Sequence, residues 1–294
     1  MKYKKPILIA EVGCNHKGDL NIAKKFIEVA KNFCGLKYIK FQKRDPKSLF
    51  TEEEYNKPHP VIENSYGSTY GEHREFLEFS SDQHQILYDN CKLNGLIYSS
   101  SVWDFKSALD IISIKPLFIK VPSACNLNKK LLKVLCKNFY GEIHLSLGMT
   151  TRKEEKKIIN LFKKYDRLKD LVIYSCTSGY PVQFKDVCLK EISRLKKSYG
   201  NLVKAVGFSG HHLGIAVDLG AFMLGAEYIE RHFTMDRTWK GTDHAASLEP
   251  DGLRKLVRDI DSLAASFEEK SIEILEVELN QRNKLKVNQI LWEE

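Results

Sequence analysis

Short apolar runs alternate with longer amphipathic segments along most of the chain, and eight such pairs can be counted. Each run is brief, which is typical of a fully buried parallel strand, and glycine, proline or asparagine flanks the pairs. The pattern predicts eight strands, at residues 7–13, 38–42, 97–101, 117–121, 143–146, 171–175, 205–209 and 228–232. It predicts that the following helices begin near Leu20, Ser81, Asp104, Asn128, Arg152, Asp186, Leu213 and Pro250.

Eight strand and helix pairs in this order predict a (β/α)8 TIM barrel, an α/β fold in which one domain reaches this length. We expect the barrel to span residues 1–265 and a helical tail to span residues 266–294. A doubly wound open sheet would alternate in the same way, but EVGCNHKG after the first strand is not the GxGxxG loop of that fold. The long loop at residues 43–80 follows the second strand, on the side where barrels hold their active sites, and is predicted to form a lid.

Composition and charge exclude several classes of function. Hydrophobic residues make up 43% of the chain and charged residues 29%, as in folded globular proteins. The net charge of +8 is spread among helices instead of forming a compact basic stripe with aromatic residues, which favours an anionic substrate over nucleic acid. The seven cysteines include no CxxC pair, which indicates reduced thiols. Apolar runs are too short for a signal peptide core or a membrane span, so we expect a cytoplasmic protein.

Polar side chains gather at the predicted C-terminal ends of the strands, where barrels assemble their active sites. They include two lysines, an arginine and several hydroxyls, which together can hold a phosphate and a carboxylate through charge-assisted hydrogen bonds. One such lysine alone would more often form an ion pair at the rim, but convergence of several favours a binding site. The strand-end residues are Glu11, Asn15, His16, Lys40, Gln42, Ser100, Ser101, Asp104, Lys120, Ser123, Asn126, Ser146, Thr177, Ser178, Tyr180, Ser209, His211, His212, Arg231 and His232.

Two of these histidines form a candidate metal site. His211 and His232 do not have the spacing of a metal motif, yet they follow adjacent predicted strands. Both imidazoles can therefore point at one divalent ion, whereas a lone histidine would more often be structural.

A series of motifs runs through the chain in a specific order. They are IAEVGCNHKGDLNIAKK, YIKFQ, IKVPSACN, LSLGMTT, SCTSGYP, VGFSGHHLG and YIERHFTMDRTWKGTDHAASLEPDGL. In these motifs the chain resembles the N-acetylneuraminate (sialic acid) synthase family over about residues 5–265. The ordered set of GCNHKGD, KFQ, LGM, ERHFT and TDHAASLEP is far more specific than any one of them.

The resemblance implies a metal-dependent condensation of phosphoenolpyruvate with an aldose-type sugar, N-acetylmannosamine or a related one. C3 of phosphoenolpyruvate would attack the sugar aldehyde, water would attack C2, and loss of phosphate would leave a 3-deoxy-2-ulosonic acid. The metal, manganese or alternatively magnesium, would be held by His211 and His232. The resemblance implies catalytic or sugar-side roles for Glu11, Gln42 and Asp243. The positions matching the family's phosphoenolpyruvate contacts are Lys40, Ser101, Lys120, Ser123, Ser146, Ser178, Tyr180 and Ser209.

Three departures from the family pattern concern the acceptor side. Cys125 stands where the family has Glu or Asp, so it is a catalytic candidate for proton transfer. A thiol moves a proton only if its pKa is tuned, and Glu11 or Asp243 is the alternative for this role. Gly210 replaces a carboxylate beside His211, which is expected to loosen this region or make room for a different acceptor. Family members also continue into an antifreeze-like domain that contributes an arginine, so we expect an acceptor without the N-acetyl group or a separate chain that supplies the contact.

Two other functions stay open. A synthase for a phosphorylated aldose, like the octulosonate and heptulosonate synthases, would share the donor chemistry, although ERHFT and SLEP favour the sialic acid side. A non-catalytic paralogue that binds a sugar or stabilises a partner barrel would explain Cys125 and Gly210. A homodimer would have to form through barrel surfaces and residues 271–292 of the tail.

Overall fold

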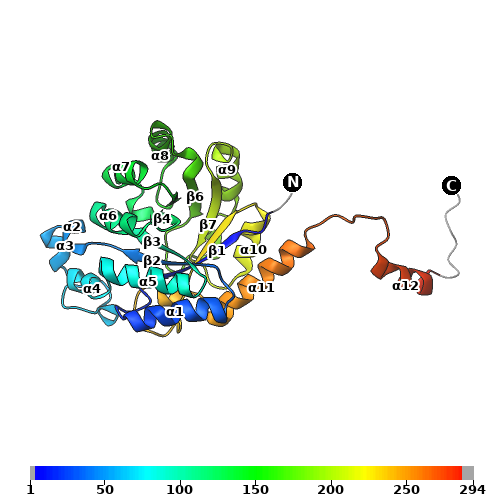
Figure 1. The fold of residues 1–294 in the computed structure, drawn as a ribbon, viewed down its shortest axis with the longest axis horizontal. Coiled ribbons are helices and arrows are strands. Elements are labelled where there is room, and N and C mark those ends of the chain that lie inside the picture. Colours follow the sequence, from blue (N-terminus) through cyan, green and yellow to red (C-terminus); the bar gives the residue numbers. More distant parts are fainter. Residues whose placement is uncertain (1–3, 287–294) are drawn as a thin grey trace.

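The computed structural model describes residues 4–286 and contains one closed barrel of eight strands in chain order, each parallel to its neighbours (Figure 1). The TIM barrel prediction is confirmed, and the open sheet is wrong because β1 pairs with both β2 and β8. All eight predicted strands are present, and the observed ends differ by one residue at most. The strands are β1 (Ile7–Gly13), β2 (Tyr38–Lys43), β3 (Ile97–Val102), β4 (Phe118–Val121), β5 (Glu142–Ser146), β6 (Leu171–Cys176), β7 (Ala205–Gly210) and β8 (Tyr228–His232).

An outer layer of helices surrounds the barrel. Side chains cap several of them: oxygens of Asp19, Ser80 and Thr151 accept backbone N–H groups of the first turn. The helices are α1 (Leu20–Asn32), α5 (Ser81–Leu93), α6 (Phe105–Ile114), α7 (Lys129–Asn138), α8 (Arg152–Lys164), α9 (Lys190–Tyr199), α10 (Ala216–Met223) and α11 (Pro250–Ser266).

Two predicted helix starts are too early. The helix expected near Asp186 is α9, which begins only at Lys190, because Cys188 has a φ of 53° and interrupts helical geometry. The helix expected near Leu213 is α10, which begins at Ala216, because Gly214 has a φ of 72°. In both places the chain passes through the left-handed region before the helix starts.

The barrel interior changes character along its axis. Near the N-terminal ends of the strands it is filled by a cluster that includes Ile9, Phe118 and Val172. Tyr174 lies in the same cluster, and its hydroxyl is 2.8 Å from Nδ1 of the buried His144. This packing closes one end of the barrel, so only the C-terminal end is open to a ligand.

The insertion after β2 contains the short helices α2 (Pro46–Leu49), α3 (Glu52–Asn56) and α4 (Tyr70–Phe76). It contacts the loop that follows β8: the Tyr66 hydroxyl donates to the carbonyl of Lys240 at 2.6 Å, and the Gly241 N–H donates to Asn64 Oδ1 at 3.2 Å. The insertion therefore reaches across the rim to the opposite side of β1.

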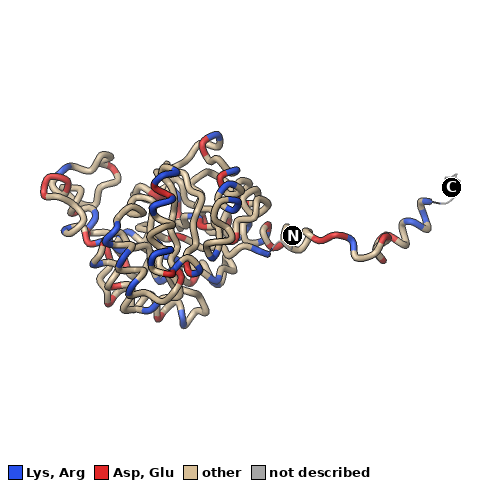
Figure 2. Tube along the Cα trace, turned by 90° about the horizontal axis from the view of Figure 1, so that it is seen from above, with Lys and Arg blue, Asp and Glu red and all other residues tan. Residues whose placement is uncertain are grey.

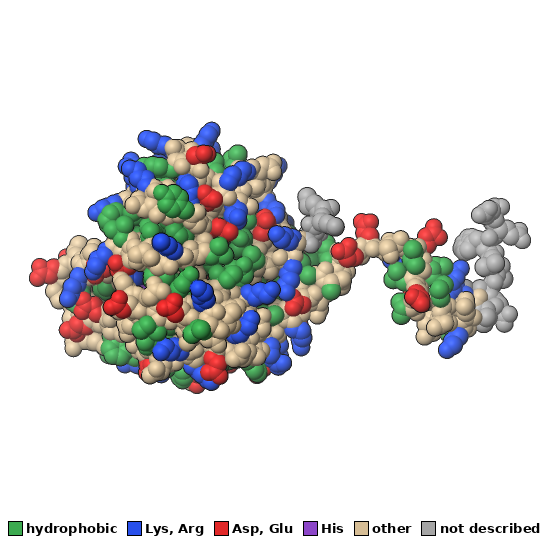
Figure 3. Space-filling model, in the orientation of Figure 1, with side chains coloured by type: hydrophobic (Ala, Val, Ile, Leu, Met, Phe, Trp, Pro, Cys, Tyr) green, Lys and Arg blue, Asp and Glu red, His purple; other side chains and the backbone are tan. Residues whose placement is uncertain are grey.

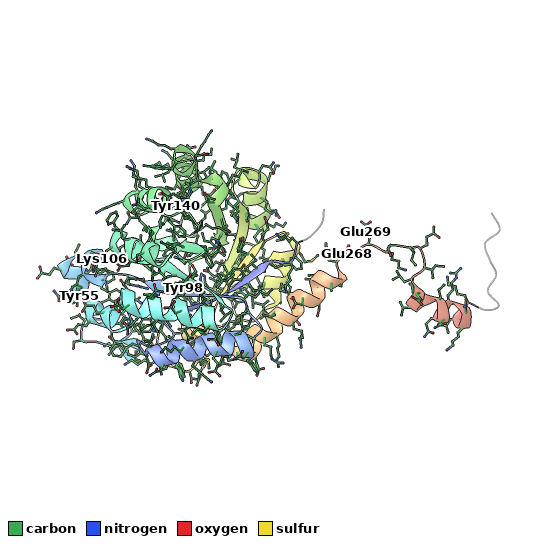
Figure 4. All side chains as sticks on the ribbon, viewed as in Figure 1. Tyr55, Tyr98, Lys106, Tyr140, Glu268 and Glu269 are labelled. Atoms are coloured by element: carbon green, nitrogen blue, oxygen red, sulfur yellow. The ribbon has the colours of Figure 1, made fainter. Side chains whose placement is uncertain are left out.

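Beyond α11 the chain runs away from the barrel to α12 (Glu276–Leu285) (Figure 1). Glu268 and Glu269 lie on the connecting segment (Figure 4). None of the α12 residues is buried, and Lys270 pairs with Glu278 at 2.8 Å. The last part of the predicted tail, residues 287–294, lies outside the described residues, as does part of the segment 271–292 considered for dimer contacts.

Charged residues of both signs cover the barrel. Segments with Lys or Arg and segments with Asp or Glu are scattered over the whole trace (Figure 2), and the face in Figure 3 mixes basic, acidic and apolar side chains. Within residues 4–286, no helix has both the length and the apolar character needed to cross a membrane.

Candidate active site

A cavity of about 290 Å³ opens at the C-terminal ends of the strands. The residues predicted to be catalytic, substrate-binding or metal-binding all line it except Cys125 and Ser178. Barrel closure brings these side chains together, since strand ends far apart in sequence meet around one rim. The other strand-end residues do not line the cavity: Asn15, His16, Ser100, Asp104, Asn126, Thr177, His212 and Arg231. The lining residues are Glu11, Lys40, Gln42, Arg44, Arg74, Ser101, Trp103, Lys120, Pro122, Ser123, Ser146, Cys176, Tyr180, Ser209, His211, Glu230, His232, Thr242 and Asp243.

Two buried lysines and two buried carboxylates form the floor of the cavity. Lys120 Nζ is 2.9 Å from Glu230 Oε2, and Lys40 Nζ is 3.8 Å from the same oxygen. Lys40 also pairs with Glu11 and donates to Ser101 Oγ at 2.6 Å. An anionic ligand can exchange partners with these carboxylates without leaving the ammonium groups uncompensated.

The two carboxylates have opposite pKa shifts. Burial raises the pKa of Glu11 to about 7, and attraction to Lys40 only partly offsets this. Burial would raise the pKa of Glu230 as well, but Lys120 and Lys40 together hold it far below its usual value. Glu11 can therefore carry or release a proton near neutral pH, as a general acid or base must, while Glu230 stays ionised.

Hydroxyl groups surround this floor. Ser209 Oγ donates to Glu230 Oε1 at 3.1 Å, and Ser123 Oγ lies 3.7 Å from Cys176 Sγ. Ser101 and Ser146 come from β3 and β5 on the same rim. Lysines and hydroxyls in this arrangement can bind the phosphate and the carboxylate of one small anion.

The histidine pair stands at the same rim. The ring centroids of His211 and His232 are 5.4 Å apart, and the Tyr180 ring packs against both. His211 Nδ1 is 3.1 Å from the Thr177 carbonyl, which favours the tautomer with a proton on Nδ1.

The pair fits a divalent cation in its chemistry. Nδ1 of His232 is buried without a hydrogen-bond partner among residues 4–286 and lies 4.0 Å from Asp243 Oδ2. Burial lowers the pKa of His232 to about 4, so its imidazole is neutral at pH 7, as a metal ligand must be. The described residues contain no cluster of three or more His, Cys, Asp or Glu suited to a metal, so oxygen ligands would complete the coordination.

Two predicted site residues, Cys125 and Ser178, are not among those that line the cavity. The Cys125 thiol donates to the carbonyl of Trp103 at 3.1 Å, and burial raises its pKa to about 12, which suits a structural thiol more than proton transfer. Ser178 Oγ is buried without a hydrogen-bond partner in the described part of the chain. A Cβ on Gly148 would approach Ser178 Oγ to 2.5 Å, so this hydroxyl lies against the neighbouring loop.

The arginine expected at the mouth is also placed elsewhere. Arg231 is buried outside the cavity, where it pairs with Asp218 and donates to the carbonyls of Gly214 and His212. Alternation along β8 explains this, because Glu230 and His232 face the interior and the residue between them faces the helices.

Gly210 does not make room in the cavity as expected. A Cβ there would come within 2.8 Å of Phe208 Cε1 and His212 Cε1, so the space beside it is filled by packed rings. Gly210 pairs with Arg231 and shares its outward orientation. The expectation of a wider acceptor site at this position is therefore wrong.

Sequence reasoning missed several lining residues, among them Glu230, Arg44 and Arg74. The period of two along β8 could have identified Glu230 once His232 was taken as inward-facing. Arg44 and Arg74 belong to the end of β2 and to α4. The predicted lid placed their segment near the mouth, but no spacing rule shows which of its side chains reach the cavity.

A model described as the NeuB family matches residues 26–271. The chain belongs to the NeuB family. This is the family of sialic and other nonulosonic acid synthases, so the resemblance seen in the sequence motifs is confirmed. Family membership assigns the chain to enzymes that condense phosphoenolpyruvate with a sugar.

Relatives and a solved structure support this assignment. Human N-acetylneuraminate-9-phosphate synthase is 35% identical over 278 residues, covering 95% of this chain and 76% of the human protein. The N,N'-diacetyllegionaminic acid synthase of Campylobacter jejuni is 32% identical over 302 residues, covering 99% and 89%. The crystal structure of N-acetylneuraminic acid (sialic acid) synthetase from Leptospira borgpetersenii superposes with a TM-score of 0.79 at 27% identity, covering 96% of this chain and 93% of that one.

Proposed function

We propose that this NeuB family member condenses phosphoenolpyruvate with an aldose-type sugar to form a sialic-acid-like 3-deoxy-2-ulosonic acid and phosphate. The observation that carries the proposal is the convergence of Lys40, Lys120 and their carboxylates with His211 and His232 in one cavity. The cations suit the donor, which carries both a phosphate and a carboxylate.

Donor binding rests on the floor of the cavity. Lys40 and Lys120 would each give up part of their pairing with Glu11 and Glu230 to bind the two anionic groups of phosphoenolpyruvate. The hydroxyls of the surrounding serines and of Tyr180 would complete these contacts. Low exposure strengthens every charged hydrogen bond made here.

A divalent ion, manganese or magnesium, held by His211 and His232 would supply polarisation of the aldehyde oxygen. Asp243 Oδ2 lies 4.0 Å from His232 Nδ1, and Asp243 and Gln42 both line the cavity. A sugar whose aldehyde binds beside the two histidines would therefore lie close to both residues. These two residues are proposed to orient the sugar.

Glu11 is proposed to move the protons. C3 of the donor forms a bond to the aldehyde carbon, whose oxygen takes up a proton, and water loses a proton as it adds to C2 before phosphate leaves. One carboxyl with a pKa of about 7 can donate the first proton and accept the second, so the cycle balances. This role replaces the one expected for Cys125, which does not line the cavity.

The test is phosphate release from phosphoenolpyruvate with a panel of aldoses, with manganese content measured on the same preparation. We expect release with at least one acceptor and its loss in Lys120→Met, which removes the buried ammonium group but keeps a side chain of similar length. Sugar binding without release from any acceptor would instead support a non-catalytic sugar-binding protein.

A further inference from the structure

The cavity has two chemically different sides. Lys120, Ser146 and Ser209 come from β4, β5 and β7. The opposite side is formed by β2, the insertion and the loop after β8, which follow one another around the rim because β1 pairs with both β2 and β8. That side contributes two further cations, Arg44 and Arg74, beyond the lysines of the floor.

Arg44 is held rigidly in this wall. Its guanidinium lies 3.9 Å from the centroid of the Trp103 ring, and its Nε is 3.0 Å from Glu78 Oε1. The Glu78 carboxylate also accepts from the backbone N–H of Arg44 at 2.8 Å. The arginine is 4% exposed. A planar cation locked on one side in this way presents its remaining donors in a fixed direction.

Arg74 has a different environment. Its Nε and Nη2 donate to the Tyr70 hydroxyl at 3.0 and 2.7 Å. The guanidinium is half-buried, and it forms a salt bridge with none of the carboxylates within residues 4–286. A neutral phenol orients this cation without neutralising it, so Arg74 reaches the cavity without a described carboxylate in direct contact, although the charges of Asp243 and Glu78 attract it over a longer distance.

Asp243 is the carboxylate that lines the cavity on this side. Asp243 Oδ2 lies 4.0 Å from the imidazole of His232, and Thr242 Oγ1 donates to Asp243 Oδ1 at 3.2 Å. The His232 imidazole is neutral, so the charge of Asp243 faces Arg74 and Arg44, and Arg44 already has Glu78 as its salt-bridge partner. A neutral sugar would leave Arg74 without a salt-bridge partner, whereas an anionic group on the acceptor would supply one.

We propose that the acceptor aldose carries a phosphate monoester at the end remote from its aldehyde, and that Arg74 and Arg44 bind this phosphate. The inference rests on the proposed function, because it names the acceptor of the same reaction. Guanidinium groups match the oxygens of a phosphate through paired hydrogen bonds. The names of the relatives leave the choice open, since the human one is named for a 9-phosphate product and the Campylobacter jejuni one is not.

The test compares two acceptors with the manganese-loaded full chain: N-acetylmannosamine and its 6-phosphate, each with phosphoenolpyruvate. We expect kcat/KM for phosphate release to be at least about a hundredfold higher with the sugar phosphate. Arg74→Leu should reduce the ratio of the two kcat/KM values by about tenfold to a hundredfold, the usual effect of losing a charge-assisted hydrogen bond, and Arg74→Lys by less. KM for phosphoenolpyruvate should change little in either variant.

Lys47→Leu is the matched control, because it removes a basic side chain of the same insertion that is 75% exposed. It should leave the acceptor ratio unchanged. Equal kcat/KM values for the two acceptors, or a higher value for the neutral sugar, would overturn the inference while leaving the proposed function in place. If no aldose of the panel, these two included, gives phosphate release, the proposed function fails, and the Kd of the sugar phosphate measured without phosphoenolpyruvate tests the phosphate subsite separately. Binding no tighter than that of the neutral sugar would then exclude it.

Discussion

Glu230→Gln removes one negative charge from the floor of the cavity while keeping the shape of the side chain. In the native protein this buried carboxylate lies 2.9 Å from Lys120 Nζ and 3.8 Å from Lys40 Nζ, and it accepts from Ser209 at 3.1 Å. Glutamine can still accept from Ser209. It leaves two buried ammonium groups with Glu11 as their remaining carboxylate partner in the described floor of the cavity.

Loss of one partner of a buried ion pair destabilises a protein by about 3–5 kcal/mol. Because glutamine keeps the hydrogen bond from Ser209, we expect Glu230→Gln to lower the free energy of unfolding by about 3 kcal/mol, the lower end of this range. At roughly 2–4 °C per kcal/mol for a chain of this size, Tm should fall by about 6–12 °C. Glu28→Gln is the control, because Glu28 pairs with Lys25 at 2.9 Å on the surface with both side chains half exposed. It should lower stability by at most about 0.5 kcal/mol.

Phosphoenolpyruvate should reverse much of this loss, since its anionic groups supply the charge that Glu230 supplied. Thermal unfolding followed by circular dichroism, with and without the donor, measures both effects. We expect a larger donor-induced rise in Tm for Glu230→Gln than for the native chain. A fall in Tm as small as that of Glu28→Gln, or a smaller donor effect than in the native chain, would refute this account of the lysine cluster.

Four further outcomes can be measured. His144 should contribute a loss of folding stability on the order of 3 kcal/mol as pH falls from about 6.5 to 4, because burial lowers its pKa to about 4 and the unfolded chain is protonated first; the urea midpoint of His144→Gln should therefore fall less over this window than that of the native chain. Arg231→Met should lower the unfolding free energy by about 3 kcal/mol by stranding Asp218, yet leave KM for phosphoenolpyruvate unchanged, and a raised KM would contradict its placement outside the cavity. His232→Gln should reduce bound manganese measured by atomic spectroscopy, whereas equal metal content would argue against the histidine pair. Glu11→Gln should lower kcat by about a hundredfold or more with little change in donor KM, and a kcat within a few-fold of native would remove Glu11 from proton transfer.

The alternation of apolar and amphipathic segments determined the fold. A buried parallel strand needs a short apolar run, and a crossover helix needs a longer amphipathic segment. The eight strand and helix pairs can therefore be recognised from the sequence without knowledge of the tertiary structure. Once the barrel is recognised, the strand ends must converge, which is why Lys40, Lys120, His211 and His232 could be placed in one site. The family motifs then indicated the reaction in which these residues would take part, the condensation of phosphoenolpyruvate with a sugar.

Only the tertiary structure decided which polar side chains face the cavity. Glu230 and Arg231 are neighbours in sequence, but the pleat of β8 turns one toward the lysines and the other toward Asp218. Cys125 follows a strand end as a catalytic residue would, yet its local turn directs the thiol to a backbone carbonyl. Arg74 lies in an insertion whose path over the rim depends on contacts with the distant β8 loop, so no local pattern could show that it reaches the cavity.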